Sequence, residues 1–96
     1  MITPTIGRIV WYHPGPSEPI TDYGDQPMAA IVTYVHSDTE INVAYWDHNG
    51  AFNSATSVEL VQGDTHPANR AWCEWMPYQK GQAAKYEQLE KEKSNA

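Results

Sequence analysis

Residues 41–58, Ile-Asn-Val-Ala-Tyr-Trp-Asp-His-Asn-Gly-Ala-Phe-Asn-Ser-Ala-Thr-Ser-Val, decide the fold, because they predict two strands joined by a tight turn. The pair Asn49-Gly50 favours a two-residue type I′ hairpin, since both positions of that turn need positive φ. Such a turn also sets a register, with the opposed pairs His48–Ala51, Trp46–Asn53, Ala44–Ala55 and Asn42–Ser57.

The alternation of side chains along this hairpin predicts one apolar and one mixed face. The apolar face, expected in the core, carries Ile41, Val43, Tyr45, Phe52 and Val58. The opposite face carries Trp46 among small and polar residues. This ring is either part of a binding surface or covered by another segment of the chain, a proline-rich loop or the tail.

Three further segments, 7–13, 29–36 and 71–78, are rich in β-branched and aromatic residues and are expected to be strands. Four prolines in residues 14–27 predict a long loop after the first strand, because proline disfavours both helix and central strand. Five strands joined by short turns after one long loop predict an all-β fold, a small five-stranded SH3-like barrel.

Residues 82–93 change to Ala, Gln, Lys, Glu and Leu, a composition typical of a helix. We therefore divide the chain into a β-barrel domain, residues 1–79, and a helical or frayed C-terminal tail, residues 80–96. A helix of about 12 residues is marginal alone, so Tyr86 and Leu89 are expected either to dock on the barrel or to pair with a second copy. A sheet edge is the alternative route to a homo-oligomer.

The chain of 96 residues has a net charge of −6, unevenly distributed. Four lysines lie in the tail, which leaves only Arg8 and Arg70 as cations in residues 1–78. Long nucleic acids owe much of their affinity for proteins to lysine and arginine, so we do not expect a long nucleic acid as partner. A single nucleotide remains compatible, because two arginines suffice to hold one or two phosphates.

Targeting signals are not evident in the sequence. No apolar run approaches the roughly 20 residues of a membrane-spanning helix, and the first residues lack a basic leader, so we expect a cytoplasmic protein without membrane contact. Cys73 is the single cysteine, which excludes an internal disulfide; it is expected to be a small buried hydrophobe.

Catalytic and metal-binding patterns are also not evident. The four histidines, His13, His36, His48 and His66, lack the spacing of metal ligands. No nucleophile motif and no phosphate-binding glycine loop occurs. We therefore expect no enzyme activity, no cofactor and no metal site.

Aromatic residues are abundant for so small a domain, with four tryptophans and six tyrosines. A barrel of this size buries only some of them, and exposed rings beside arginine and amides can stack a planar ligand or anchor a protein. Tyr34 and His36 join the Trp46 face if the turn at residues 37–40 closes with three residues. The candidate ligand-binding residues are Arg8, Tyr12, Tyr34, His36, Trp46, Asn53, Arg70, Trp72 and Trp75.

Three stretches of the chain resemble sequences in a group of small proteins of tailed bacteriophages and prophages. They are Pro4 to Tyr12 (Pro-Thr-Ile-Gly-Arg-Ile-Val-Trp-Tyr), Asp25 to Val32 (Asp-Gln-Pro-Met-Ala-Ala-Ile-Val), and Trp72 to Gln79 (Trp-Cys-Glu-Trp-Met-Pro-Tyr-Gln). The resemblance implies a phage accessory protein in the cytoplasm of an infected bacterium and transfers no catalytic residue.

Such a protein is expected to act against the host. The first expectation is counter-defence, by binding and sequestering a nucleotide-derived immune signal. The alternatives are an acidic module that inhibits a host protein, and a minor virion or assembly component.

Overall fold

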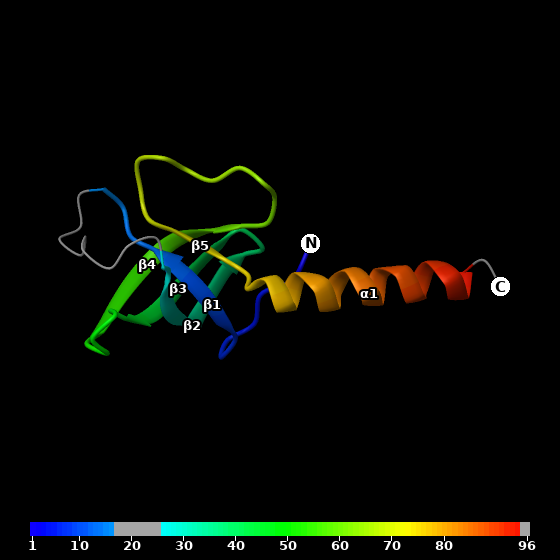
Figure 1. Cartoon of the computed structure of the whole chain (residues 1–96), viewed down its shortest axis with the longest axis horizontal. Helices are drawn as coiled ribbons and strands as arrows, with labels where there is room; N and C mark the ends of the chain where they lie inside the picture. Colours follow the sequence, from blue (N-terminus) through cyan, green and yellow to red (C-terminus); the bar gives the residue numbers. More distant parts are fainter. Residues whose placement is uncertain (17–25, 95–96) are drawn as a thin grey trace.

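The structure, a computed structural model, describes residues 1–16 and 26–94. Five strands form a closed barrel, and one helix follows it (Figure 1). The elements are β1 (Ile9–His13), β2 (Met28–Ser37), β3 (Glu40–Trp46), β4 (Phe52–Val61), β5 (Trp72–Glu74) and α1 (Pro77–Ser94). The predicted small five-stranded barrel with a C-terminal helix is confirmed.

The barrel closes through its shortest strand. β1 to β4 form an antiparallel meander, and β5 lies between β1, to which it is antiparallel, and β4, to which it is parallel. His13 is thereby paired with Trp72, and Leu60 with Cys73. This is the SH3-like order expected from the sequence. Of the predicted long loop at residues 14–27, the part from 17 to 25 lies outside the described residues.

The barrel interior is filled by inward-facing side chains from all five strands. Tyr12 and Tyr45 stack face to face across it, with ring centroids 4.1 Å apart and an interplanar angle of 14°. Such offset aromatic pairs add to the stabilisation that area burial provides. The buried cluster consists of Val10, Tyr12, Met28, Ala30, Val32, Ile41, Val43, Tyr45, Val58, Leu60, Cys73 and Trp75.

The β3–β4 turn differs from the predicted type I′ turn. The N–H of Gly50 donates to the carbonyl of Asp47, and the N–H of Asp47 donates to the carbonyl of Ala51, both at 2.9 Å. Within this turn only Gly50 has a positive φ, of 87°, whereas a type I′ turn needs positive φ at both Asn49 and Gly50. The Asp47 carboxylate accepts the N–H groups of Asn49 and Ala51, which stabilises a three-residue loop over a two-residue one. The predicted register near the turn was therefore wrong by one residue.

This shift moves Phe52 out of the core. Phe52 pairs with Trp46 and is 66% exposed, whereas the sequence placed it inside. A bulge restores the predicted register farther along, where Ile41 pairs with Val58. At the bulge Ser57 has φ of 53°, and its N–H donates to Asn42 Oδ1 at 2.8 Å.

The boundary between β5 and α1 also differs from the prediction. The last strand was expected to reach residue 78, but β5 ends at Glu74 and α1 begins at Pro77. Proline is favoured at the first helical position, where no N–H is needed. Gln79 Oε1 accepts the N–H of Met76 at 2.8 Å, which is half of a capping box.

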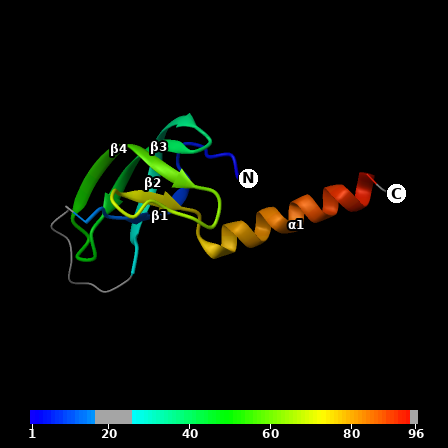
Figure 2. The same ribbon diagram turned by 90° about the horizontal axis from the view of Figure 1, so that it is seen from above.

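The helix α1 extends away from the barrel, as two perpendicular views show (Figures 1 and 2). Tyr86 and Leu89 are 68% and 52% exposed, so the expected docking of these two side chains on the barrel is not observed. Among the described residues, no helix is long and apolar enough to cross a membrane.

Candidate functional site

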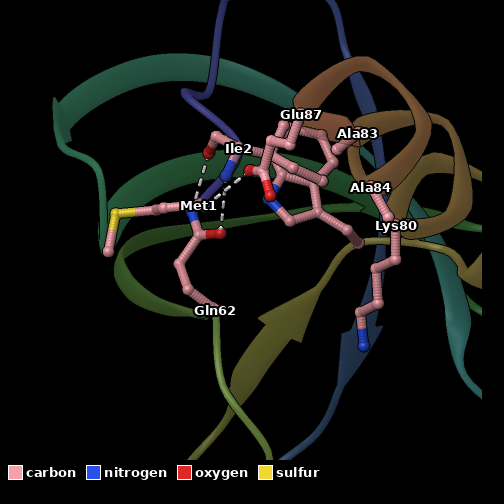
Figure 3. A pocket seen from close by; sticks show the side chains of 8 residues that line it. Met1, Ile2, Gln62, Lys80, Ala83, Ala84 and Glu87 are labelled. Carbon is pink, nitrogen blue, oxygen red and sulfur yellow. Dashed lines mark hydrogen bonds and ion pairs between the residues drawn. The ribbon is translucent and has the colours of Figure 1, made fainter. Parts of the chain in front are cut away.

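Two adjoining hollows lie where the start of the chain meets the barrel and α1. The larger has a volume of about 390 Å³ and the smaller about 220 Å³, and Ile2, Trp75 and Ala83 line both. The smaller hollow is bounded by Met1 and Ile2 on one side and by Glu87 of α1 on the other (Figure 3). The remaining residues around the larger hollow are Thr3, Arg8, Tyr78, Gln79, Gln82 and Tyr86.

Gln62, directly after β4, holds the first residues of the chain in place. Its Nε2 donates to the carbonyl of Ile2 at 2.8 Å, and its Oε1 accepts the N–H of Ile2 at 3.2 Å (Figure 3). The same Nε2 also donates to the carbonyl of Asp38 at 2.9 Å. The amino group of Met1 lies 3.6 Å from a carboxylate oxygen of Glu87. One wall of the hollows is therefore tied to both the barrel and the helix.

Gln79 ties α1 to β1 from the other side. Its Oε1 accepts the N–H of Met76, and its Nε2 donates to the carbonyl of Ile9 at 2.9 Å. Both polar atoms of this amide are thus used to orient the helix. The amide of Gln82, one turn on, makes no hydrogen bond with a described residue and is free for a ligand.

Arg8 supplies the positive charge at the larger hollow. Its Nε donates to Thr5 Oγ1 at 3.3 Å, and no described carboxylate lies within ion-pair distance of its guanidinium. The other arginine, Arg70, forms an ion pair with Glu59. Among the described residues, Arg8 is therefore the arginine available to an anion.

Trp75 lies between the two hollows and the barrel core. It is 2% exposed, and its indole Nε1 is closed to solvent. No described residue accepts a hydrogen bond from this N–H group. Buried polar groups normally have a partner, so an unpaired indole N–H at a hollow is a feature to explain.

Two exposed tyrosines complete the larger hollow. Tyr78 and Tyr86 are 72% and 68% exposed and come from α1. Exposed rings of this kind can stack against a planar ligand. The larger hollow therefore combines a cation, a free amide and aromatic side chains, a set that suits a small planar anion.

The structure brings only two of the predicted site residues, Arg8 and Trp75, to this place. Tyr12 is 1% exposed and stacks on Tyr45 inside the barrel, so it belongs to the core. Trp75 is equally buried and reaches a ligand only through the hollows it lines. The sequence could not separate these rings, because strand register and the position of α1 decide which ring faces the core and which lines a hollow.

Tyr34 and His36 lie on the outer surface near the β2–β3 turn. Their rings meet edge to face, with centroids 4.9 Å apart, and His36 Nε2 is 2.9 Å from Asn42 Oδ1. Trp46 follows Asn42 by four residues, about 13 Å along an extended strand. Tyr34 and His36 therefore share a face of the sheet with Trp46 but are not in contact with it.

Asn53 is separated from Trp46 by the shift at the hairpin. The predicted pairing of these two residues was wrong, because Asn53 pairs with Tyr45. The Asn53 side chain therefore lies on the inward-facing side of the strand pair. Trp46 instead meets Phe52 edge to face, with ring centroids 6.0 Å apart.

Trp72 is enclosed in a three-ring stack. His13 lies on one face at 3.9 Å and His66 at 4.2 Å, each with an interplanar angle of 8°. His13 Nε2 is also 2.6 Å from a carboxylate oxygen of Glu74. Both faces of Trp72, a predicted ligand-binding residue, are thus covered by histidine rings of the protein itself. Trp72 lines neither of the two hollows.

The outer surface of the barrel carries a second feature, an apolar row across four strands. Strand pairing places Ile9 beside Ile31, and Ile31 beside Ala44. Two residues after Ala44 on β3, Trp46 pairs with Phe52 of β4. Ile9 and Phe52 at its two ends are exposed, Ile31 and Trp46 are half-buried, and Ala44 is buried. We call these residues the outer row; exposed apolar surfaces of this kind often contact proteins.

Cys73 is fully buried, at 0% exposure. Burial raises the pKa of the Cys73 thiol to about 12, so the thiolate that a nucleophile or metal ligand requires is disfavoured. Within residues 1–16 and 26–94, no group of three or more metal-ligating side chains comes together.

The sequence interpretation missed Tyr78, Gln82 and Tyr86. Tyr78 was assigned to a strand, and Tyr86 was considered only for docking or dimerisation. The signal that could have found them is Pro77: read as the first residue of a helix, it places Tyr78 and Tyr86 on the same element as Gln82.

Comparison with models of protein families, with curated proteins and with solved structures finds no match to this chain.

Proposed function

We propose that this chain is a non-catalytic binding protein that takes up a small, planar, anionic ligand in the larger hollow. The proposal is carried by one observation: Arg8, whose guanidinium has no carboxylate partner among the described residues, lies around one hollow of about 390 Å³ together with Trp75, Tyr78 and Tyr86. Ligand sites in proteins usually have volumes of about 300–1,000 Å³. The hollow thus suits one ring system with one charged group.

The energetics of this set favour a nucleotide-like ligand over a simple anion. Stacking on an aromatic side chain contributes about 1–3 kcal/mol per base. A hydrogen bond between Arg8 and a phosphate is charge-assisted and contributes about 1.5–3 kcal/mol. Neither contact suffices alone for tight binding, so a ligand that offers both a ring and an anion is favoured.

The biological role proposed is sequestration. The resemblance to small phage proteins favours a nucleotide-derived signal of host defence as the ligand, and the cytoplasm of the infected bacterium as the place of action. Sequestration needs binding alone, which fits a site that combines stacking and charge without a nucleophile.

Calorimetric titration with adenosine 5′-monophosphate at low salt tests this proposal. We expect saturable binding to the wild-type chain and at least a tenfold weaker affinity in Arg8→Gln, because the variant loses the charge-assisted contact.

Arg70→Gln is the matched control, since Arg70 pairs with Glu59 outside the hollow. Its affinity should equal that of the wild type. An equal loss in both variants would favour the site predicted from the sequence around Arg70 and Trp72. No binding of any of the four common nucleoside monophosphates at millimolar concentration would refute the proposal.

A second candidate function, inhibition of a host protein, is favoured by the outer row. Its exposed members Ile9 and Phe52 could anchor a partner, and the acidic body would attract a basic one. A host polypeptide retained by the wild type, lost with Phe52→Asp and released as salt rises would support this candidate. Equal retention by both chains would exclude the outer row.

A further inference from the structure

We propose that Trp75 sets the orientation and the class of the ligand in the larger hollow. On this view the ligand inserts a heteroaromatic ring with a hydrogen-bond acceptor toward Trp75 Nε1 and leaves its anionic group at Arg8. The inference rests on the function proposed above, and it specifies in addition that the ring of the ligand carries a hydrogen-bond acceptor.

The first support is the unsatisfied indole. Trp75 is 2% exposed and its Nε1 is buried, and no described residue accepts a hydrogen bond from this N–H group. An unpaired buried donor is unfavourable, and a bound acceptor removes that cost. A ring nitrogen or a ring carbonyl is such an acceptor, whereas a hydrocarbon ring is not.

The second support is position. Trp75 lines both hollows and also belongs to the buried cluster of the barrel, so it lies at the inner end of the site. Arg8 is exposed and lines only the larger hollow. Because the charge lies at the exposed side and the donor at the inner one, the ring enters first and the anion stays near water.

The third support is the way the walls are held. Gln62 binds the backbone of Ile2, and Gln79 binds the carbonyl of Ile9. Trp75 Nε1 is closed to solvent, so a ring reaches it only when one of these contacts opens. The proposal therefore requires the Gln62–Ile2 or the Gln79–Ile9 hydrogen bond to break on binding, while the barrel stays intact.

The consequence is discrimination among ligands that share a phosphate. A site that offers a donor at its inner end rejects an analogue without an acceptor more strongly than a purely apolar site does. Adenosine 5′-monophosphate should bind, while two analogues that keep the anion should bind weakly: ribose 5-phosphate, which has no aromatic ring, and phenyl phosphate, whose aromatic ring carries no acceptor.

The test compares adenosine 5′-monophosphate with phenyl phosphate on the wild type and on Trp75→Phe. We expect the wild type to bind the nucleotide at least tenfold more tightly than phenyl phosphate, and Trp75→Phe to bind the two about equally. Trp11→Phe, on β1 and away from the hollows, is the matched control and should keep the wild-type preference. Unchanged preference in Trp75→Phe would overturn the inference.

A second measurement covers the case in which Trp75→Phe fails to fold. In the wild-type chain, the indole N–H of Trp75 should shift downfield in a ¹⁵N-correlated NMR spectrum when the nucleotide is added, and stay in place with phenyl phosphate. A nucleotide that binds without moving this resonance refutes the role of Trp75 and leaves the proposed function standing. Absence of all binding refutes the proposed function itself.

Discussion

Replacing Leu60 by alanine should lower the free energy of unfolding by about 3 kcal/mol, because Leu60 is 0% exposed at the centre of the barrel. The loss combines the transfer free energy of the removed methyl groups with the cavity they leave. Small domains are stable by about 5–15 kcal/mol, so this single change removes a large share. Chemical denaturation followed by tryptophan fluorescence measures it.

Leu89→Ala provides the matched control for Leu60→Ala. Leu89 is 52% exposed on α1, so the same truncation should change the free energy of unfolding by less than about 0.5 kcal/mol. Equal losses in the two variants would mean that α1 packs against the barrel in solution. That outcome would contradict the extended helix and the hollows at its base.

Replacing Gly15 by alanine should cost about 1–3 kcal/mol, because the added methyl group meets backbone and not a flexible side chain. A Cβ atom built at Gly15 lies 3.0 Å from the nitrogen of Ala71 and 3.2 Å from the carbonyl carbon of Arg70. These residues lead directly into β5, the strand that closes the barrel. The change therefore strains the closure, and thermal unfolding should show a lower midpoint.

Gly81→Ala makes the same chemical change where space is free. Nothing lies within 4 Å of a Cβ at Gly81, and the residue is inside α1. Alanine is favoured over glycine in a helix by about 1 kcal/mol, so helicity measured by circular dichroism should rise. A Gly15→Ala variant as stable as the wild type would contradict the close approach of residues 15 and 70–71.

The fold could be predicted largely from local sequence features. The β-branched and aromatic segments marked the strands, and the prolines after His13 marked the first long connection. The pattern of residues along the strands did not predict the length of the turn that begins at Asp47. An Asp side chain that accepts two backbone N–H groups changes a two-residue loop into a three-residue one, and this one-residue shift places Phe52 outside.

The site could be predicted only in part. Arg8 and Trp75 were identified, but their neighbours come from α1, and the strand assigned to residues 71–78 hid the start of that helix. Two other aromatic residues predicted from the sequence to bind a ligand are instead stacked against side chains of the protein itself. Tyr12 stacks on Tyr45, and Trp72 lies between His13 and His66. Ring pairs of this kind depend on strand register, which amino-acid composition does not reveal.

Amide chemical-shift mapping during a titration with adenosine 5′-monophosphate tests whether the larger hollow binds the ligand. We expect shifts that saturate together at Arg8, Tyr78, Gln82 and Tyr86, which line this hollow. Shifts centred instead on the Trp46 face, or no shift at millimolar nucleotide, would contradict this expectation.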